Sequence, residues 1–505
     1  MSYAQNRRSF ESTTSYATLW SNTNWNKAQK YVDKQQRRIY RAESNNDKRK
    51  VRDLQRMLVR SSAALKLAIK RVTQINNGKK TPGLDGFRAV NDKQRGELFI
   101  KMRNMNINLH KPKPAYRIHI PKKNNKTRPL SIPVIIDRIY QELLRMALEP
   151  QWEVRFEPVS YGFRPKRRAH DAMERIFYNV KNGNWCWIFE GDFKSCFDTL
   201  DHNFILKQIE GFPYIKIVER FLKAGYVDNN VFYRTKVGTP QGGLLSPLLA
   251  NIALTGMEEC LGISYNKVTR KNGSTTYNPK GNYRMVRYAD DFVIFAKSKN
   301  EIDKVYDILN PYLEERGLTL AEDKTRIVHI SEGFDFLGFE TRQRHTQDGD
   351  KCFIKPSKNT LKNARIKIAE RFDLMKGHNV KDLIYSLNPL IDGLANYWKP
   401  MVSTKAFEMM DYYIWIKVKK FLKHLHPNKG WKWIRAKYFP TPKKDDKHQD
   451  KWILTDPETG IQLKKMKWTN IDKRHIMIKH NHSPYDSSKL DYFINRKVML
   501  SKRFG

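Results

Sequence analysis

The feature that most constrains this chain is a pair of acidic residues set between two short apolar runs. Residues 285–288 and 292–296 are separated only by Ala289, Asp290 and Asp291. Two short apolar runs joined by so few residues are typical of a buried β-hairpin. Aspartates also occur in ordinary hairpin turns, where they bond to the backbone. The Tyr-Ala-Asp-Asp tetrapeptide alone therefore fits either a plain turn or a metal site.

A second carboxylate follows a second predicted strand. Residues 185–190 form a short apolar run, and Gly191 and Asp192 come directly after it. A hairpin beside this strand would aim Asp290 at Asp192. Carboxylates gathered in one place repel one another, and a bound cation relieves that cost. Because Mg²⁺ prefers oxygen ligands, the set predicts two Mg²⁺ (or Mn²⁺) ions about 4 Å apart, as phosphoryl transfer requires.

The charge of the chain indicates a polyanionic partner. Among 505 residues, 95 Lys and Arg stand against 52 Asp and Glu, so the formal net charge is +43. Such a charge repels itself unless a polyanion neutralises it. Nucleic acid is the commonest such partner, and an anionic membrane surface is the alternative. The N-terminus lacks an apolar signal segment, and no apolar run of about 18 residues occurs. We therefore expect no membrane partner and a cytoplasmic (in bacteria, nucleoid-associated) or organellar protein that is not secreted.

Strand and helix patterns alternate over most of the chain, and helices dominate after residue 355. The periodicity predicts strands at 116–120, 285–288, 292–296 and 334–338, with a basic hairpin after the first and a polar surface insertion over 265–282. It predicts helices within 25–76 (one of them over 54–72) and over 135–148, 244–259, 301–316, 361–375, 380–397 and 405–425. From about residue 452 no core pattern is evident.

Several segments, in a consistent order, resemble the motifs of reverse transcriptases. YADDFVIFA resembles their catalytic hairpin, EGDFKSCFDTLDH their first carboxylate motif, and VGTPQGGLLSPLLANIAL the motif that follows it. GLTLAEDKTRIVHI and GFDFLGF resemble the two motifs after that. IPKKNNKTRPLSIP, QINNGKKTPGLDG and LNPLIDGLANYW resemble the fingertip hairpin, N-terminal extension and thumb helices of group II intron reverse transcriptases. The resemblance covers about residues 20–500 and is to the group II intron-encoded reverse transcriptase and maturase family.

The resemblance implies an α+β fold: a right-hand polymerase, with fingers and a palm built on an antiparallel sheet, followed by an α-helical thumb or maturase domain. We expect a helical, template RNA-binding N-terminal extension over residues 1–86 and fingers and palm over 87–345. The thumb or maturase domain would span 346–440, and a basic DNA-binding tail would span 441–505.

The implied function is that of an RNA-directed DNA polymerase and intron maturase. Such a protein binds group II intron RNA, assists its splicing and copies it from dNTPs into target DNA by target-primed reverse transcription. A domesticated reverse transcriptase serving defence, repair or a CRISPR system is one alternative, and a splicing-only maturase is another. Intact Asp192, Asp290 and Asp291 count against the latter. The oligomeric state is left open.

The resemblance assigns catalytic roles residue by residue. Asp192 and Asp290 would be the shared metal ligands, Asp291 a supporting acid, and the backbone carbonyl of Phe193 would face a metal. Lys324 matches a lysine that would protonate the leaving pyrophosphate, and a plain surface lysine is the alternative.

The resemblance also implies residues that bind the dNTP. Lys122 and Arg128 would clamp the triphosphate, or else belong to a solvated basic turn. Phe197 would lie against the 2′ position of the sugar and favour dNTPs, or else pack in the core. Gln241 lies in a Pro-Gln-Gly-Gly turn that allows close backbone approach to a nucleotide, or else merely starts a helix.

Basic residues in two places would bind nucleic acid. Lys79 and Lys80 lie in the segment that would grip template RNA. In the thumb, the lysines of one predicted helix would contact phosphates: Lys417, Lys419, Lys420 and Lys423. The nearby Trp415, Trp431 and Trp433 fit core packing better than base stacking.

The cysteines mark a departure from the family. Many members end in an HNH endonuclease with paired CxxC motifs, whereas Cys186, Cys196, Cys260 and Cys352 form no such pair. We therefore expect this chain not to cleave the second DNA strand, whether it belongs to a branch without the nuclease or is truncated.

Overall fold

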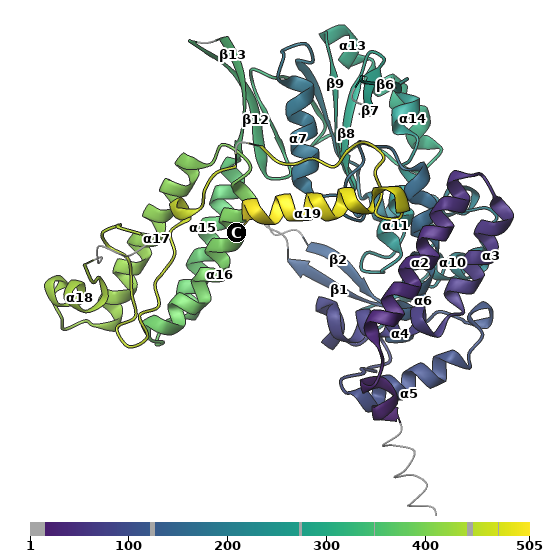
Figure 1. Ribbon diagram of the computed structural model, residues 1–505, viewed down its shortest axis with the longest axis horizontal. Helices are drawn as coiled ribbons and strands as arrows, with labels where there is room; N and C mark the ends of the chain where they lie inside the picture. The colour runs from purple at the N-terminus through teal and green to yellow at the C-terminus, as the bar shows by residue number, and fades with distance from the viewer. Residues whose placement is uncertain are drawn as a thin grey trace, which may run out of the picture. The chain divides into compact units, whose positions relative to one another are not determined.

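The computed structural model describes residues 16–121, 127–271, 275–347, 349–441, 448–472 and 474–504. These residues divide into two compact units that alternate along the chain (Figure 1). The first unit contains the described parts of 1–168, 189–327 and 478–494. The second contains those of 169–188, 328–477 and 495–505. The mixture of sheets and helix bundles confirms the predicted α+β architecture.

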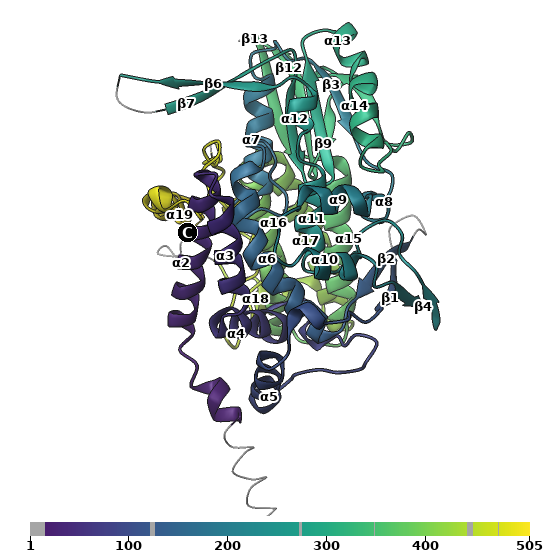
Figure 2. The same cartoon turned by 90° about the vertical axis from the view of Figure 1, so that its right-hand side faces the viewer.

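The first unit begins with three helices that pack against a long fourth one (Figure 2). They are α2 (Trp25–Ser44), α3 (Lys48–Val59) and α4 (Ser62–Lys70), and the fourth is α6 (Ile135–Arg155). The prediction of one helix over 54–72 is wrong, because the Ser61 hydroxyl accepts a hydrogen bond from the Ala64 N–H and starts α4 anew. Between α4 and α6 lie η1 (Arg71–Ile75), η2 (Asn77–Lys80), α5 (Asp92–Arg103) and η3 (Ile107–Leu109).

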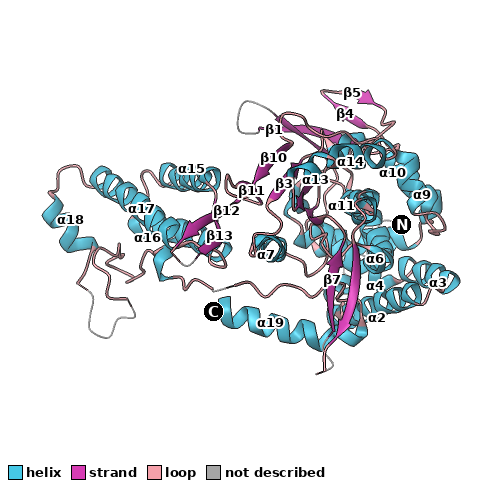
Figure 3. Cartoon of the chain, turned by 90° about the horizontal axis from the view of Figure 1, so that it is seen from above, coloured by secondary structure: helices cyan, strands magenta, loops and turns pink. Residues whose placement is uncertain are grey.

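A four-stranded sheet follows, in the order β2-β1-β4-β5, and Figure 3 labels its strands β1, β4 and β5. Its strands are β1 (Ala115–Pro121), β2 (Thr127–Ile132), β4 (Tyr226–Asp228) and β5 (Val231–Tyr233). The predicted basic hairpin is confirmed, since β1 and β2 pair antiparallel with Tyr116 opposite Ile132. The tip of this hairpin, residues 122–126, lies outside the described part of the chain.

A second four-stranded sheet has the order β10-β3-β9-β8. It contains β3 (Trp187–Gly191), β8 (Arg284–Tyr288), β9 (Asp291–Ala296) and β10 (Arg326–His329). The first unit also contains the helices α8 (Cys196–Thr199), α9 (His202–Gln208), α10 (Ile215–Leu222), α11 (Ser246–Ala253), α12 (Met257–Cys260), α13 (Lys299–Asp303) and α14 (Val305–Glu314).

Two predicted helices near this sheet are interrupted. The backbone of Gly256 has φ 98°, which is incompatible with an α-helix. The segment 244–259 therefore forms two helices, α11 and α12, instead of one. The segment 301–316 divides at Lys304 into α13 and α14. The polar insertion over 265–282 is a two-stranded ribbon that projects from its unit (Figure 2), formed by β6 (Ser264–Thr269) and β7 (Thr275–Lys280).

The second unit combines α7 (Ala169–Val180), a three-stranded antiparallel sheet and a helical bundle. The sheet contains β11 (Phe334–Phe336), β12 (Phe339–Thr346) and β13 (Gly349–Pro356). The bundle contains α15 (Lys358–Leu374), α16 (Val380–Trp398), α17 (Thr404–Leu425) and α18 (Trp431–Tyr438). The three long helices predicted after residue 355 are therefore confirmed. They pack through buried apolar faces that include Ile368, Leu387 and Phe407.

The last part of the chain is more ordered than its sequence pattern indicates. It contains η4 (Met466–Trp468), η5 (Ser487–Lys489) and the helix α19 (Leu490–Phe504). The expectation of no core pattern after residue 452 is wrong, since Leu454, Leu463 and Met466 are buried in the second unit. Among the helices that the structure describes, none has the length and apolarity that crossing a bilayer would need.

Candidate active site

The acidic pair lies at the turn of the predicted hairpin. Strands β8 and β9 pair antiparallel with Tyr288 opposite Asp291, so Ala289 and Asp290 form the turn. Ala289 has φ 59°, in the left-handed region. For a residue with a side chain, this conformation costs about 1–2 kcal/mol. The turn therefore needs neighbours that stabilise it.

Strand β3 brings Asp192 beside this turn. In the sheet order β3 lies next to β9. A Cβ atom on Gly191 would lie 2.1 Å from the Phe292 ring, so only glycine allows the two strands to approach so closely. The carbonyl of Asp192 accepts a hydrogen bond from the Ala321 N–H at 2.8 Å, which attaches the end of β3 to the 319–325 loop.

The three carboxylates influence one another electrostatically. The surrounding protein and the charges of Asp290 and Asp192 raise the pKa of Asp291 to about 6, although Asp291 still reaches solvent. Burial, joined by the charge of Asp192, also raises the pKa of Asp290. Asp290 and Asp291 are thus less stable ionised than they would be in water, and a cation beside them would relieve this cost.

A cation already meets this acidic group. The Lys324 ammonium lies 2.6 Å from Asp192 Oδ2, and this hydrogen bond raises the pKa of Lys324. In the described part of the chain, no three His, Cys, Asp or Glu side chains are drawn together at metal-binding distances. The donor set nevertheless fits Mg²⁺, because it consists of hard carboxylate oxygens that destabilise one another until a cation binds.

Two residues assigned to the dNTP lie together on the β1–β2 side of the site. Arg128 Nε donates to Gln241 Oε1 at 3.0 Å, and Gln241 Nε2 donates to Asp198 Oδ2 at 3.4 Å. The Gln241 carbonyl accepts from the Ser131 N–H at 2.6 Å. Gly242, at φ 113°, has no room for a Cβ atom, which would lie 2.4 Å from the Ser131 carbonyl oxygen. The turn therefore packs its backbone closely against β2, and its approach to a nucleotide stays a prediction.

Asp198 was not among the predicted site residues. It follows Phe197 directly and anchors Gln241, and burial raises its pKa despite the opposing charges of Arg117 and Arg128. Its place six residues after Asp192, within the EGDFKSCFDTLDH motif, was the available sequence signal.

Phe197 is packed and also borders a cavity. Its side chain is 8% exposed and contacts Phe163 edge to face, with ring centroids 6.3 Å apart. It lines a cavity of about 360 Å³ together with Asp198 and basic residues that include Arg117 and Arg234. Phe193, by contrast, is buried against Phe292, with its ring centroid at 5.0 Å.

The remaining predicted residues lie elsewhere. Lys122 lies outside the described residues. Lys79 and Lys80 are exposed on η2 of the first unit, where Arg138 donates to the carbonyls of Gly78 and Thr81 on either side of them.

The thumb lysines form a surface on α17 of the second unit. Lys419, Lys420 and Lys423 are exposed, and Lys417 is half-buried. Trp415 and Trp431 are half-buried and pack together at 6.0 Å, whereas Trp433 is 39% exposed, so core packing is wrong for Trp433.

Three sequence-family models match this chain in succession. They are the N-terminal domain of reverse transcriptase over residues 20–102, the reverse transcriptase (RNA-dependent DNA polymerase) over 120–341, and the group II intron maturase-specific domain over 361–439. The protein YkfC of Escherichia coli is 34% identical over 307 residues, which cover 55% of this chain and 81% of YkfC.

The chain belongs to the group II intron reverse transcriptase and maturase family. The group II intron-encoded protein LtrA of Lactococcus lactis is 31% identical over 329 residues, 54% of each chain. A putative COX1/OXI3 intron 1 protein of Saccharomyces cerevisiae is 32% identical over 272 residues, 45% of this chain and 32% of that protein. The match thus spans about half of LtrA and about a third of the yeast protein.

Membership in this family confirms the polymerase and maturase interpretation of the motifs. The β8–β9 hairpin and Asp192 fall inside the reverse transcriptase match, and α15 to α18 overlap the maturase-specific match. The chain therefore combines a reverse transcriptase region with a group II intron maturase region.

Proposed function

We propose that this chain is an RNA-directed DNA polymerase and maturase that binds a group II intron RNA, assists its splicing and copies it into target DNA by target-primed reverse transcription. The observation that carries the proposal is the group of three interacting carboxylates, Asp192, Asp290 and Asp291, at the ends of β3 and β9. Polymerisation needs such acids, and the reverse transcriptase and maturase matches supply the context.

Asp192 and Asp290 would hold two Mg²⁺ ions, or Mn²⁺, with Asp291 and the Phe193 carbonyl in support. When bound, such ions activate the primer hydroxyl and stabilise charge on the transferred phosphate and leaving group. The chain itself contributes Lys324, whose ammonium lies at Asp192 and suits proton donation to the pyrophosphate. It also contributes the hydrogen bond that attaches Asp192 to the 319–325 loop.

Arg128, Gln241 and Lys122 would bind the triphosphate and sugar of the incoming dNTP. The Arg128–Gln241 hydrogen bond supports this, because it holds a guanidinium ready for a phosphate oxygen. Phe197 would exclude a ribose 2′-hydroxyl, since a packed ring bordering a cavity cannot easily move aside.

Basic surfaces in both units would hold the nucleic acids. Lys79 and Lys80 would contact the template RNA, and the α17 lysines Lys417, Lys419, Lys420 and Lys423 would contact intron RNA or primer duplex. We propose the N-terminal extension over 1–86, the fingers and palm over 87–345, the maturase domain over 346–440 and the DNA-binding tail over 441–505 as functional segments. These segments do not coincide with the two compact units, which are defined by packing.

The test is a primer-extension assay followed by recovery of the bound RNA. Purified protein should incorporate dTTP on an oligo(dT)-primed poly(rA) template with Mg²⁺, and EDTA should stop it. RNA sequenced from the protein isolated from its host should contain a group II intron. Incorporation without any intron RNA would favour a domesticated reverse transcriptase, and intron RNA without incorporation would favour a splicing-only maturase.

A further inference from the structure

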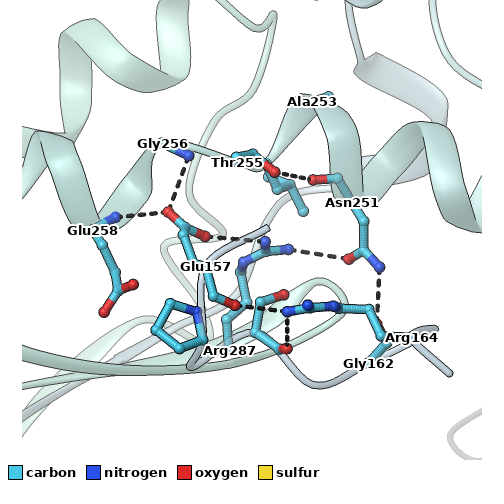
Figure 4. Close-up of polar contacts among 12 residues, drawn as sticks. Glu157, Gly162, Arg164, Asn251, Ala253, Thr255, Gly256, Glu258 and Arg287 are labelled. Carbon is cyan, nitrogen blue, oxygen red and sulfur yellow. Dashed lines mark hydrogen bonds and ion pairs between the residues drawn. The ribbon is translucent and has the colours of Figure 1, made fainter. Parts of the chain in front are cut away.

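A fully buried arginine lies beneath the acidic turn. Arg287, in β8, is 0% exposed. Its guanidinium donates to Glu157 Oε2 at 3.3 Å and to Asn251 Oδ1 at 3.2 Å (Figure 4). It also donates to the carbonyl oxygen of Ala289 at 3.3 Å. Burying a charge is costly unless it is paired and hydrogen-bonded, so each of these acceptors matters to the placement of the guanidinium.

Each partner of Arg287 is attached to another element. The second carboxylate oxygen of Glu157 accepts from the N–H groups of Gly256 at 3.0 Å and Glu258 at 2.9 Å, at the start of α12 (Figure 4). The side-chain amide of Asn251, on α11, donates to the carbonyl of Gly162 at 2.8 Å. Because other segments fix both Glu157 and Asn251, these two acceptors hold the guanidinium of Arg287 in one position.

The backbone around Arg287 is anchored as well. Its N–H donates to the Val159 carbonyl at 3.0 Å, and its carbonyl accepts from the Tyr161 N–H at 2.9 Å. A Cβ atom on Gly162 would lie 2.2 Å from the Ala289 nitrogen, so the acidic turn rests directly on this segment.

We propose that Arg287 is a positioning residue for the acidic pair. Its bond to the Ala289 carbonyl orients the peptide that leads into Asp290, at the one turn residue with a left-handed φ. The direction of the Asp290 carboxylate then depends on a guanidinium fixed by Glu157 and Asn251. A lysine could not replace it fully, because a single ammonium lacks the planar fork that reaches several acceptors at once. The inference rests on the proposed function, in which Asp290 holds a metal ion.

A second buried arginine provides a matched control. Arg164 is 6% exposed and pairs with Glu153 at 2.8 Å. It also donates to the carbonyls of Glu157 and Ser160, at 2.6 and 2.9 Å. These acceptors all belong to α6 or to the loop after it, and none of them is part of the β8–β9 turn. Losing Arg164 thus removes a buried ion pair and two bonds to the loop that carries Glu157, but it leaves the donor to the Ala289 carbonyl in place.

The experiment compares Arg287→Gln, Arg287→Lys and Arg164→Gln in the full-length protein. Arg287→Gln should lower kcat for dTTP incorporation about 100-fold, the loss expected when reacting groups shift by about 1 Å. Its KM for dTTP should stay within about threefold of wild type, since the Arg128 side of the site is untouched. Arg287→Lys should retain part of the rate. Arg164→Gln should lose comparable thermal stability but keep kcat within about fivefold, because the bond from Arg287 to the Ala289 carbonyl remains.

Two readouts besides activity separate positioning from general stability. Hydrogen exchange over residues 284–296 should become faster in Arg287→Gln and remain at the wild-type rate in Arg164→Gln. Binding of Mn²⁺ alone, followed by electron paramagnetic resonance of the free ion, should weaken only in Arg287→Gln.

Equal kcat, exchange and Mn²⁺ affinity in the two glutamine variants would overturn the inference. If Arg287→Gln does not fold, Arg287→Lys and Asn251→Ala decide, and wild-type kcat in both would equally refute it. A wild-type protein without any dTTP incorporation would instead contradict the proposed polymerase. The exchange and Mn²⁺ comparisons would still test whether Arg287 positions the turn.

Discussion

The β8–β9 hairpin of the first unit carries negative charges, and the α17 helix of the second carries positive ones. The acids are clustered and partly buried, whereas most of the lysines are exposed on a surface. The hairpin carries Asp290 and Asp291, whose pKa values are raised by burial and by neighbouring carboxylates. Its turn has a left-handed Ala289, whose carbonyl accepts a hydrogen bond from the buried Arg287. The helix presents lysines that are mostly exposed, on a surface that needs only its summed charge. The acidic site should therefore fail completely on a single substitution, whereas the basic surface should weaken gradually.

The largest effect is expected from Asp290→Ala. Removing a metal ligand should lower dTTP incorporation by about 1,000-fold or more, because the metal supplies several kcal/mol of charge stabilisation. Intron RNA affinity, measured by filter binding, should stay within about threefold, since RNA contacts elsewhere persist. Asp303→Ala, at the exposed end of α13, is the control and should retain activity. Full-rate synthesis by Asp290→Ala would show that the Asp290 carboxylate is not part of the active site.

Phe197→Val tests the nucleotide side of the same region. A smaller side chain on the cavity wall should admit a ribose hydroxyl and shift the ratio of kcat/KM for dTTP over UTP toward UTP by about 10- to 100-fold. Phe204→Val, at a comparably buried phenylalanine, should destabilise the fold without changing this ratio. An unchanged ratio in Phe197→Val would leave Phe197 a core residue only.

The basic surface is tested by changing four lysines of α17 to glutamine together, at Lys417, Lys419, Lys420 and Lys423. Intron RNA should bind about 10-fold more weakly, and the slope of log affinity against log salt should become shallower by about 0.7 for each phosphate that the protein no longer neutralises. Incorporation at saturating primer-template should persist. The same charge removal at exposed first-unit positions, Lys207, Lys216, Lys299 and Lys304, is the control. Equal weakening in both variants would mean that net charge alone determines the affinity.

The smallest expected effect concerns His482, in the C-terminal part of the first unit. Burial and the charges of Lys489 and Lys479 lower the pKa of His482 to about 4, and its ring lies 4.8 Å from that of Tyr492. Because the unfolded chain binds this proton near pH 6.5, the stabilisation is complete above that pH and is lost as pH falls toward 4. Thermal midpoints should thus fall between pH 7.5 and pH 4.5, and His482→Gln should reduce that fall. The same reduction in the exposed His345→Gln would contradict this assignment.

The β8–β9 hairpin was predictable because the residues that specify it are adjacent in the sequence. Alternation of apolar runs around Asp290 and Asp291 determines strands, turn and register over a few residues. Asp192 was predictable for the same reason, as the residue after a short apolar strand. That Lys324 meets Asp192 was not predictable from spacing, since the contact depends on how the 319–325 loop returns to β3.

Helix breaks and the final segment were predicted less well. The apolar periodicity over 54–72 continues through Ser61, yet its hydroxyl starts a new helix because the chain must turn there to cover α6. The partners of buried polar side chains could not be predicted from the sequence either. Arg496, for example, pairs at 2.5 Å with Asp171, a residue of α7 far away in sequence.

The sequence by itself determined the chemistry of this protein: the order of its motifs, its acidic pair, its basic charge and its family. These features depend on residue types and short spacings, which can be recognised without knowledge of the fold. Only the tertiary structure decided how the acidic pair is held, through Arg287 of β8, Asn251 of α11 and Glu157 of the loop after α6. Such contacts arise between residues distant in the chain, and the cost of burying a charge selects partners that no local pattern reveals.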